Sequence, residues 1–498
     1  MTVTLLVRRF LLDHARNPVN ILVLVLVPTV FVLVASGALA DAARLLGGAG
    51  NATQMETVTA GWAAGFVAAI GMYFQIAGNR APDRRLVQSG LTRSTFVAAR
   101  LLTGLSLALI ATAVACLALV ARVGVIDLWP VAMGTLIFAF IYVAIGAIVG
   151  ASVANAVNGT VLILFIWILD VFFGPTLSAS TSAITRLLPT HFVSAWMAGL
   201  RIDHGGATGD LGWSLAWASV ALACSALIVA HTTRIATGNP HKSRNSPKFQ
   251  FLTVLHQGIT SWRRNTVLWV LLVVVPAVFV LLAAAITPPG RMTILLKEGS
   301  SAATIVDPAH IHAGTMAPAG VAALAALAGI FVVLDNRRAD RRLVTSGISV
   351  RALVAARLFT VALAATLATA SSLVFTIFVF DAHNWPVYAV ATWLIALTYG
   401  CIGVLLGPIF GPVSGVLIAF LVPFLDLGIG QSPMLRPEPD SWAQWLPGYG
   451  GMRMLIDGAL TKGFDEGPSL LFALAWLLTA VAASTWAITA SVRGQRHN

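Results

Sequence analysis

Apolar stretches of about 20 residues recur along the whole chain and leave little room for a soluble fold. Such a stretch can cross a bilayer as a helix, because a helix satisfies its own backbone hydrogen bonds. Only 10% of the residues are charged, against roughly 25% in soluble proteins. The pattern predicts an all-α polytopic membrane protein of about twelve spans. These lie near residues 20–40, 58–78, 97–121, 129–151, 157–175, 211–233, 267–287, 316–334, 353–380, 385–407, 411–428 and 468–491.

Basic residues gather on one side of this map. If both termini and the loops near 79–96 and 336–352 share a compartment, it receives most of the 31 lysines and arginines. Loops rich in Lys and Arg stay in the cytoplasm. We therefore expect a multi-pass protein of the bacterial cell (plasma) membrane with both termini cytoplasmic. The net charge of +12 then reflects topology, whereas nucleic-acid binding would need a soluble basic face with aromatic residues.

Two distant stretches have nearly the same sequence. NRAPDRRLVQSG, from Asn79, corresponds to NRRADRRLVTSG, from Asn336. Other matches keep a similar offset: Pro28 with Pro276, Trp129 with Trp385, and Asp170 with Asp426. Each half has an even number of expected spans, so both enter the membrane from the same side as parallel repeats. The predicted domains are a first six-span repeat at 1–235, a basic cytoplasmic linker at 236–250 and a second six-span repeat at 251–498.

Each half also opens with an amphipathic segment. Apolar residues with helical spacing form one stripe, and polar residues form the opposite face. The stripe of the first half is Val3, Leu6, Val7, Phe10 and Leu11, and that of the second half is Leu252, Leu255, Ile259 and Trp262. We expect both segments to be interfacial helices that lie in the plane of the membrane surface.

The repeated loop keeps an order of side chains that topology alone does not explain. Lys and Arg in any order would hold the loop in the cytoplasm. Both copies instead read Asp-Arg-Arg-Leu-Val and then reach a Gly that breaks the helix. We interpret each copy as a short helix that docks a cytoplasmic partner, with a pure topology signal as the alternative. The docking residues are Asp83, Arg84, Arg85 and Leu86, with Asp340, Arg341, Arg342 and Leu343.

With this loop the chain resembles the permeases of ABC-2 type transporters, the membrane partners of ATP-binding cassette ATPases. That family has an interfacial helix, six spans per half and a coupling helix between spans two and three. Asp83 stands where the family usually has Glu. The family also carries a half-inserted, re-entrant helical pair on the external side before span six. LLPTHFVSAWMAGLR, from Leu187, and WLPGYGGMRMLIDGAL, from Trp445, look like it. Most such permeases are six-span halves that dimerise, whereas this chain resembles two halves fused.

The resemblance implies the transmembrane subunit of an ABC exporter. Its substrate would be hydrophobic or amphipathic, such as a drug in multidrug efflux, an antibiotic or a lipid-like molecule. The ATPase would be a separate cytoplasmic protein, present in two copies, that carries ATP and Mg²⁺. The chain shows no GxxxxGK[ST] loop, the backbone cradle that binds nucleotide phosphates. We therefore expect neither enzyme activity nor a bound cofactor in this chain.

The family lines its pathway mainly with spans two and five. Here this implies the aromatic residues Phe66, Phe74, Phe172, Phe173, Phe331 and Phe424. Asp170 and Asp426 lie near the outer end of span five in each half. An acid at membrane depth is costly and usually faces a cavity or a partner. Two interpretations stand: the acids line the pathway and meet polar or cationic substrate, or they are helix-end charges that cap the following turn.

Other chemistry is sparse. His310 and His312 have no evident third ligand, so we expect a solvated loop and no metal site. The alternative function is a secondary transporter driven by an ion gradient. That function would need several ionisable groups in mid-span, and the deep spans hold almost none. A neighbouring ATPase gene would favour the ABC reading over this alternative.

Overall fold

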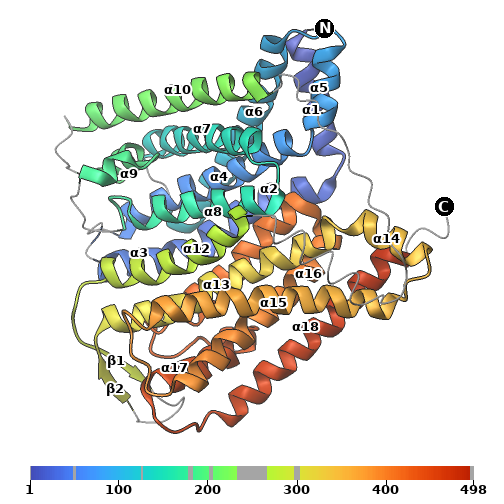
Figure 1. Cartoon of the computed structure of the whole chain (residues 1–498). Helices are drawn as coiled ribbons and strands as arrows, with labels where there is room; N and C mark the ends of the chain where they lie inside the picture. Colours follow the sequence, from blue (N-terminus) through green and yellow to red (C-terminus); the bar gives the residue numbers. More distant parts are fainter. Residues whose placement is uncertain are drawn as a thin grey trace. The chain divides into compact units, whose positions relative to one another are not determined.

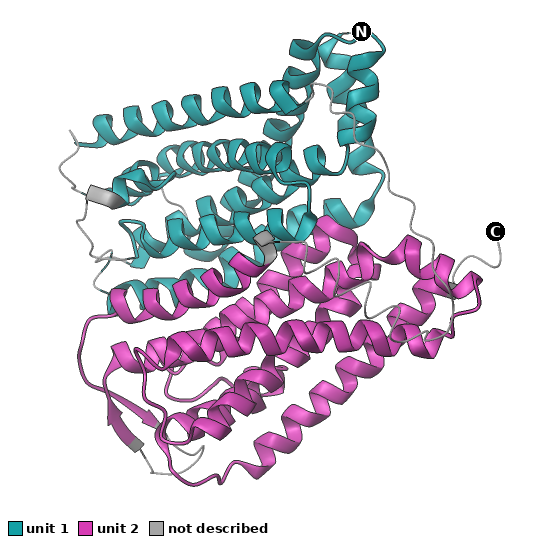
Figure 2. Ribbon diagram, in the orientation of Figure 1, with its two compact units in different colours: residues 1–241 teal, residues 242–498 magenta. Residues whose placement is uncertain are grey.

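The computed structural model describes residues 2–46, 48, 52–124, 127–177, 183–200, 206–232, 266–295 and 303–493. The chain separates into two compact units, Met1–His241 and Lys242–Asn498 (Figure 2). Helices make up nearly all of each unit (Figure 1), as the hydropathy pattern predicts. The expected linker at 236–250 and the second amphipathic segment at 252–262 lie outside the described residues.

The first unit begins with α1, which confirms the predicted helix at the N-terminal segment. Its apolar stripe packs inward on α6, and Arg9, Asp13 and Arg16 stay exposed. The helices of this unit are α1 (Val3–Ala15), α2 (Pro18–Val30), a π-helical turn (Phe31–Ala35), α3 (Ser36–Leu45), α4 (Ala52–Ala77), α5 (Arg80–Gln88), α6 (Arg93–Val123), α7 (Leu128–Ser152), α8 (Ala156–Phe172), a 3-10 turn (Ala183–Leu187), α9 (His191–Met197) and α10 (Gly206–Thr232).

The second unit has one feature that hydropathy did not indicate, an antiparallel hairpin in which Met292 pairs with Val306. These are the only strands among the described residues. The elements of this unit are α12 (Thr266–Ile286), β1 (Met292–Leu295), β2 (Ala303–Val306), α13 (Pro308–Leu334), α14 (Arg337–Thr345), α15 (Val350–Thr376), α16 (Trp385–Pro423), a π-helical turn (Phe424–Gly430), a 3-10 turn (Ala443–Trp445), α17 (Tyr449–Leu460) and α18 (Gly467–Arg493).

The number of spans differs from the expected twelve. Within the described residues, 10 helices are long and apolar enough to cross a membrane. The apolar helix α8 has 17 residues and falls just short. The spans expected at 385–407 and 411–428 lie in one continuous stretch, Trp385–Gly430, in which Gly411 (φ 72°, ψ −172°) has non-helical backbone and separates two helices. The count of 10 therefore differs from twelve at α8 and at this stretch.

Small residues bring the central helices of each unit into close contact. In the first unit α7 packs on α4, and a Cβ at Gly146 would lie 2.2 Å from the carbonyl oxygen of Ala69. In the second unit α16 packs on α13, and a Cβ at Gly403 would lie 2.0 Å from the carbonyl oxygen of Ala326. Only glycine permits such backbone contact between helices. These glycines therefore set how closely the two helices of each pair approach.

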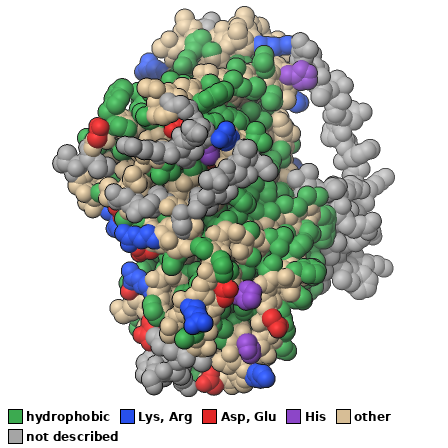
Figure 3. Space-filling view, turned by 90° about the vertical axis from the view of Figure 1, so that its left-hand side faces the viewer, with side chains coloured by type: hydrophobic (Ala, Val, Ile, Leu, Met, Phe, Trp, Pro, Cys, Tyr) green, Lys and Arg blue, Asp and Glu red, His purple; other side chains and the backbone are tan. Residues whose placement is uncertain are grey.

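Large apolar side chains cover much of the outer surface, as Figure 3 shows for one face. On α10 and α18 most of the residues are exposed or half-buried, and only 22% and 28% of the apolar windows of these helices are buried. Leu227, Leu471 and Leu478 are about 70% exposed, at 71%, 69% and 69%. A soluble protein would not tolerate so much exposed apolar surface, whereas lipid tails cover it without cost.

Candidate coupling helices and buried carboxylates

The repeated loop folds into a helix of 9 residues in each unit, α5 and α14. Each helix ends at a glycine with positive φ, 99° at Gly90 and 97° at Gly347. The amide of Leu91 donates to the carbonyl of Leu86, and the amide of Ile348 donates to that of Leu343. This is a Schellman cap, in which a residue with a Cβ would be strained at the glycine position. The shared Ser-Gly therefore sets where each helix stops and the next span begins.

A buried ion pair holds each short helix against the span that follows it. Arg100 Nη2 on α6 donates to Asp83 Oδ1 on α5 at 2.5 Å. On the other unit, Arg357 Nη2 on α15 donates to Asp340 Oδ1, and its Nε donates to Asp340 Oδ2 at 3.2 Å. All four residues are at most 4% exposed. Breaking one partner of such a pair costs about 3–5 kcal/mol, because the other charge stays buried.

The electrostatics of these aspartates follow from their burial. Removal from water raises the pKa of the Asp83 carboxyl, and the charge and hydrogen bond of Arg100 oppose that rise. The pKa of Asp340 is raised for the same reason, against the opposing effect of Arg357. The two arginines were not among the predicted site residues. The sequence feature that could have indicated them is their position, because each arginine follows its aspartate by 17 residues.

In the first unit the ion pair also reaches the amphipathic helix α1. The guanidinium carbon of Arg100 lies 3.8 Å from the ring centroid of Phe10 and 5.7 Å from that of Phe96. A cation over an aromatic face at this distance is attracted by the ring electrons. Arg100 therefore contacts three elements at once, namely α1, α5 and its own helix α6.

The remaining loop residues divide into exposed and enclosed side chains. Arg85 and Arg342 are exposed and point to no partner among the described residues. Leu86 and Leu343 are half-buried. Arg341 donates through Nε and Nη2 to the carbonyl oxygen of Ser491 at the end of α18, at 3.3 and 3.2 Å. The exposed side chains of the repeated motif are therefore Arg85 and Arg342 rather than the two aspartates.

The second pair of candidate acids lies in a different environment. Asp170 at the end of α8 is 1% exposed, and donors from its own unit occupy its carboxylate. Tyr142 Oη donates to Oδ2 at 2.8 Å, Thr190 Oγ1 donates to Oδ2 at 2.6 Å, and the Thr190 amide donates to Oδ1 at 3.2 Å. Thr190 is the residue directly before α9. The acid thus holds the start of that short helix.

Asp426 makes the corresponding contacts in the second unit. It is 2% exposed and accepts from the hydroxyl of Tyr399. The amide of Gly448, directly before α17, donates to Oδ2 at 2.7 Å, and Gln431 Nε2 donates to Oδ1 at 3.1 Å. In both units the carboxylate ties the end of one helix to the start of a short one. This geometry favours the capping interpretation over contact with substrate.

Residues 51–231 match the family model described as ABC-2 family transporter protein. This part of the chain is an ABC-2 transporter membrane domain. It holds α4 to α10, with the Asp83–Arg100 pair and the Asp170 cluster. ABC-2 permeases lack a nucleotide-binding domain and pair with separate ABC ATPases. A search of curated proteins gave no match.

The predicted aromatic lining is only partly accessible. In the ABC-2 domain Phe66 is buried, with its ring centroid 5.2 Å from that of Trp167, and in the second unit Phe331 is buried as well. The half-buried members are Phe74, Phe172, Phe173 and Phe424. These four side chains therefore keep part of their surface accessible.

The solvated loop predicted for His310 and His312 is wrong, because both residues lie in the first turns of α13. His310 is exposed, whereas His312 is buried and its Nδ1 lies 2.7 Å from Thr287 Oγ1. No group of three or more His, Cys, Asp or Glu side chains in the described ranges could hold a metal ion.

Proposed function

We propose that this chain is the transmembrane subunit of an ABC exporter that moves a hydrophobic or amphipathic substrate outward, with ATP hydrolysed on separate subunits. The observation that carries the proposal is α5. It is a short basic helix, held to the next span by a buried ion pair, within the part of the chain that matches an ABC-2 transporter. Its exposed Arg85 is available to a partner while Asp83 holds the helix in place.

The second unit serves, in this proposal, as the other half of the transporter. It has a helix of the same length with the same ion pair, and a Tyr–Asp cluster before α17 that parallels the one before α9. Two fused halves that enter the membrane from the same side would offer one coupling helix to each of two ATPase copies. α9 and α17 would be the re-entrant helices on the external side, each held by its aspartate.

Force from the ATPase would pass through the buried ion pairs. A push on α5 moves Asp83. Because Asp83 is bonded to Arg100 in a buried ion pair, α6 would move together with α5. Arg100 also lies against Phe10, so α1 at the membrane surface would move with the same unit. Such a linkage is a contiguous physical path between the docking site and the spans.

The substrate class follows from the residues that remain accessible. The half-buried Phe74, Phe172, Phe173 and Phe424 present apolar rings, and the two nearby carboxylates are occupied by the chain's own donors. A drug, an antibiotic or a lipid-like molecule suits such a lining. An ion-driven transporter would need unoccupied ionisable groups at membrane depth.

The test is capture of an ATPase by the full-length chain. Tagged protein purified from its native membrane should retain an ATP-binding cassette ATPase, and Arg85→Glu together with Arg342→Glu should lower its affinity. Each lost charge-assisted contact costs roughly 1.5–3 kcal/mol, so ten-fold or greater weakening is expected. Arg9→Glu, an exposed arginine on α1, is the matched control and should leave capture unchanged. A double variant that inserts correctly and still stimulates the ATPase would exclude docking through these helices.

A further inference from the structure

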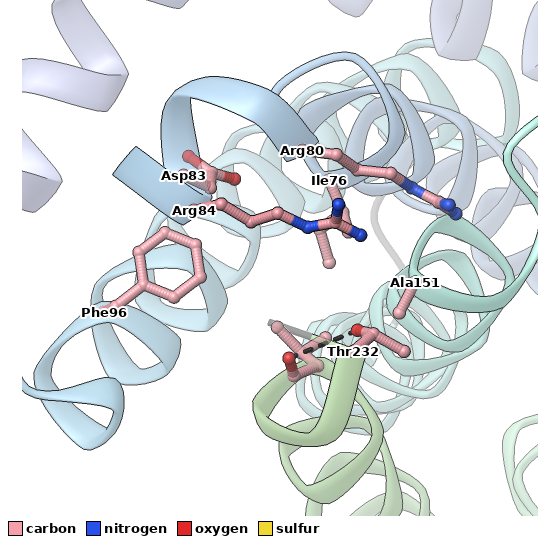
Figure 4. Close-up of a pocket in the computed structure, with 8 residues that line it drawn as sticks. Ile76, Arg80, Asp83, Arg84, Phe96, Ala151 and Thr232 are labelled. Atoms are coloured by element: carbon pink, nitrogen blue, oxygen red, sulfur yellow. Dashed lines mark hydrogen bonds between the residues drawn. The ribbon is translucent and has the colours of Figure 1, made fainter. Parts of the chain in front are cut away.

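A pocket lies between α5 and the ends of the neighbouring spans in the first unit (Figure 4). The centre of a water-sized sphere can move through about 40 Å³ of it, and the space between the lining atoms, open solvent included, totals about 370 Å³. Side chains from five helices line it: Ile76, Arg80, Asp83, Arg84, Phe96, Ala151, Val229 and Thr232. One wall is therefore charged and belongs to α5, and the other walls are largely apolar.

The charged wall has an excess of positive charge. Asp83 is already paired with Arg100. Arg80 donates through Nε and Nη2 to the carbonyl oxygen of Gly150 at 3.2 and 2.6 Å, which fixes its position but does not neutralise its charge. Burial lowers the pKa of Arg80, Tyr73 opposes that shift, and the nearby charge of Arg84 adds to it. The two guanidinium groups repel each other, so an anion between them would be stabilised.

Arg84 is the group that an anion could engage. It is half-buried, and none of the described residues forms a hydrogen bond or an ion pair with its guanidinium. Figure 4 shows its side chain reaching from α5 toward the end of α10, near Thr232. A guanidinium presents a planar fork of donors that suits the oxygens of a phosphate.

The second unit shows what the same side chain does when the chain supplies an acceptor. Arg341 holds the corresponding place in the repeated motif, and the carbonyl oxygen of Ser491 accepts two of its donors. The two repeated loops therefore share a sequence but differ at this arginine. Arg341 is bonded to the end of α18, whereas Arg84 lies beside a pocket.

We infer that this pocket binds the phosphodiester headgroup of an anionic phospholipid of the cytoplasmic leaflet, with Arg84 as its main ligand and Arg80 beside it. The apolar walls formed by Ile76, Phe96 and Val229 suit the glycerol and the start of the acyl chains. Basic pockets between the cytoplasmic ends of spans are typical sites for anionic lipid headgroups. The assignment to the cytoplasmic leaflet rests on the membrane orientation given in the proposed function. The preference of the pocket for an anion does not depend on that orientation. A bound lipid would hold α5 in the position from which it meets the ATPase.

Binding can be measured on the purified full-length chain without any ATPase, so its outcome is separate from that of the exporter proposal. The chain in detergent is titrated with phosphatidylglycerol, phosphatidylcholine and inorganic phosphate, and bound lipid is counted by native mass spectrometry. Phosphatidylglycerol should bind in preference to the other two. Arg84→Gln should weaken it roughly ten-fold, the loss of about one charge-assisted contact. Arg341→Gln is the matched control and should leave lipid binding unchanged.

A second variant guards against loss of fold. Arg84→Lys keeps the charge but not the planar fork, so it should retain part of the affinity. Wild-type affinity for phosphatidylglycerol in Arg84→Gln would overturn the inference, as would equal losses in Arg84→Gln and Arg341→Gln. Stronger binding of inorganic phosphate than of lipid would overturn the assignment to a lipid. Preferential binding of phosphatidylglycerol that depends on Arg84 would support it.

Discussion

Arg100 on α6 donates a hydrogen bond to Asp83 on α5, 17 residues earlier in the chain, and solvent reaches neither side chain appreciably. Arg357 and Asp340 repeat the relationship at the same separation in the second unit. The acid of each repeated loop is thus enclosed by its own unit, whereas Arg85 and Arg342 stay exposed.

We expect loss of the Asp83–Arg100 ion pair to lower the stability of the folded protein. Asp83→Ala leaves the guanidinium of Arg100 buried and unpaired, which should cost about 3–5 kcal/mol. Replacing both partners by apolar residues of similar size, Asp83→Leu with Arg100→Met, should recover much of that loss. Thermal unfolding of the purified variants in detergent measures both effects. A single variant that melts at the wild-type temperature would contradict the importance of the pair.

The carboxylates of Asp170 and Asp426 should behave as caps of the short helices. Asp170→Ala leaves the donors of Tyr142 and Thr190 unsatisfied in a buried site, with an expected cost of about 1–3 kcal/mol for each group left without a partner. Tyr142→Phe removes only one donor and should cost less. Melting temperature and substrate profile are measured together. Unchanged melting with an altered substrate profile would return these acids to the pathway.

Close packing between helices makes a sharp prediction at Gly146. A methyl group there would lie 2.2 Å from the Ala69 carbonyl oxygen, so the helices must separate. Gly146→Ala should destabilise the protein by about 1–3 kcal/mol. Gly71→Ala is the matched control, because a Cβ there meets nothing within 4 Å. Equal melting temperatures for the two variants would show that α4 and α7 do not pack as described.

The predicted orientation can be tested at exposed positions on the two sides of the expected map. In a variant with Cys116, Cys224 and Cys401 replaced, single cysteines are placed at Ser89, after α5, and at Lys462, after α17. An impermeant thiol reagent applied to intact cells should label position 462 and spare position 89. The reverse pattern would place α5 outside the cell and exclude its docking to an ATPase.

Local features of this protein could be read from the sequence alone. An apolar run must satisfy its backbone hydrogen bonds within itself to cross a bilayer, so hydropathy predicted the helices that form the ten long spans. The break at Gly90 and Gly347 was also predictable, because a glycine that ends a helix acts through its own backbone. Gly146 and Gly403 likewise act through a property of the residue itself, because the absence of a side chain allows two helices to come close.

Tertiary structure decided which side chains meet. Four arginines follow Asp83 within 17 residues, and only the fold of α5 back onto α6 selects the last of them, Arg100. The donors to Asp170 come from α7 and from the residue before α9, and no spacing in the sequence connects them. Likewise, Arg84 and Arg341 occupy the same place in the repeated motif, yet among the described residues only Arg341 forms hydrogen bonds to the end of a neighbouring span. Backbone preferences act between adjacent residues, whereas a buried charge finds its partner through packing of distant helices, which one sequence does not display.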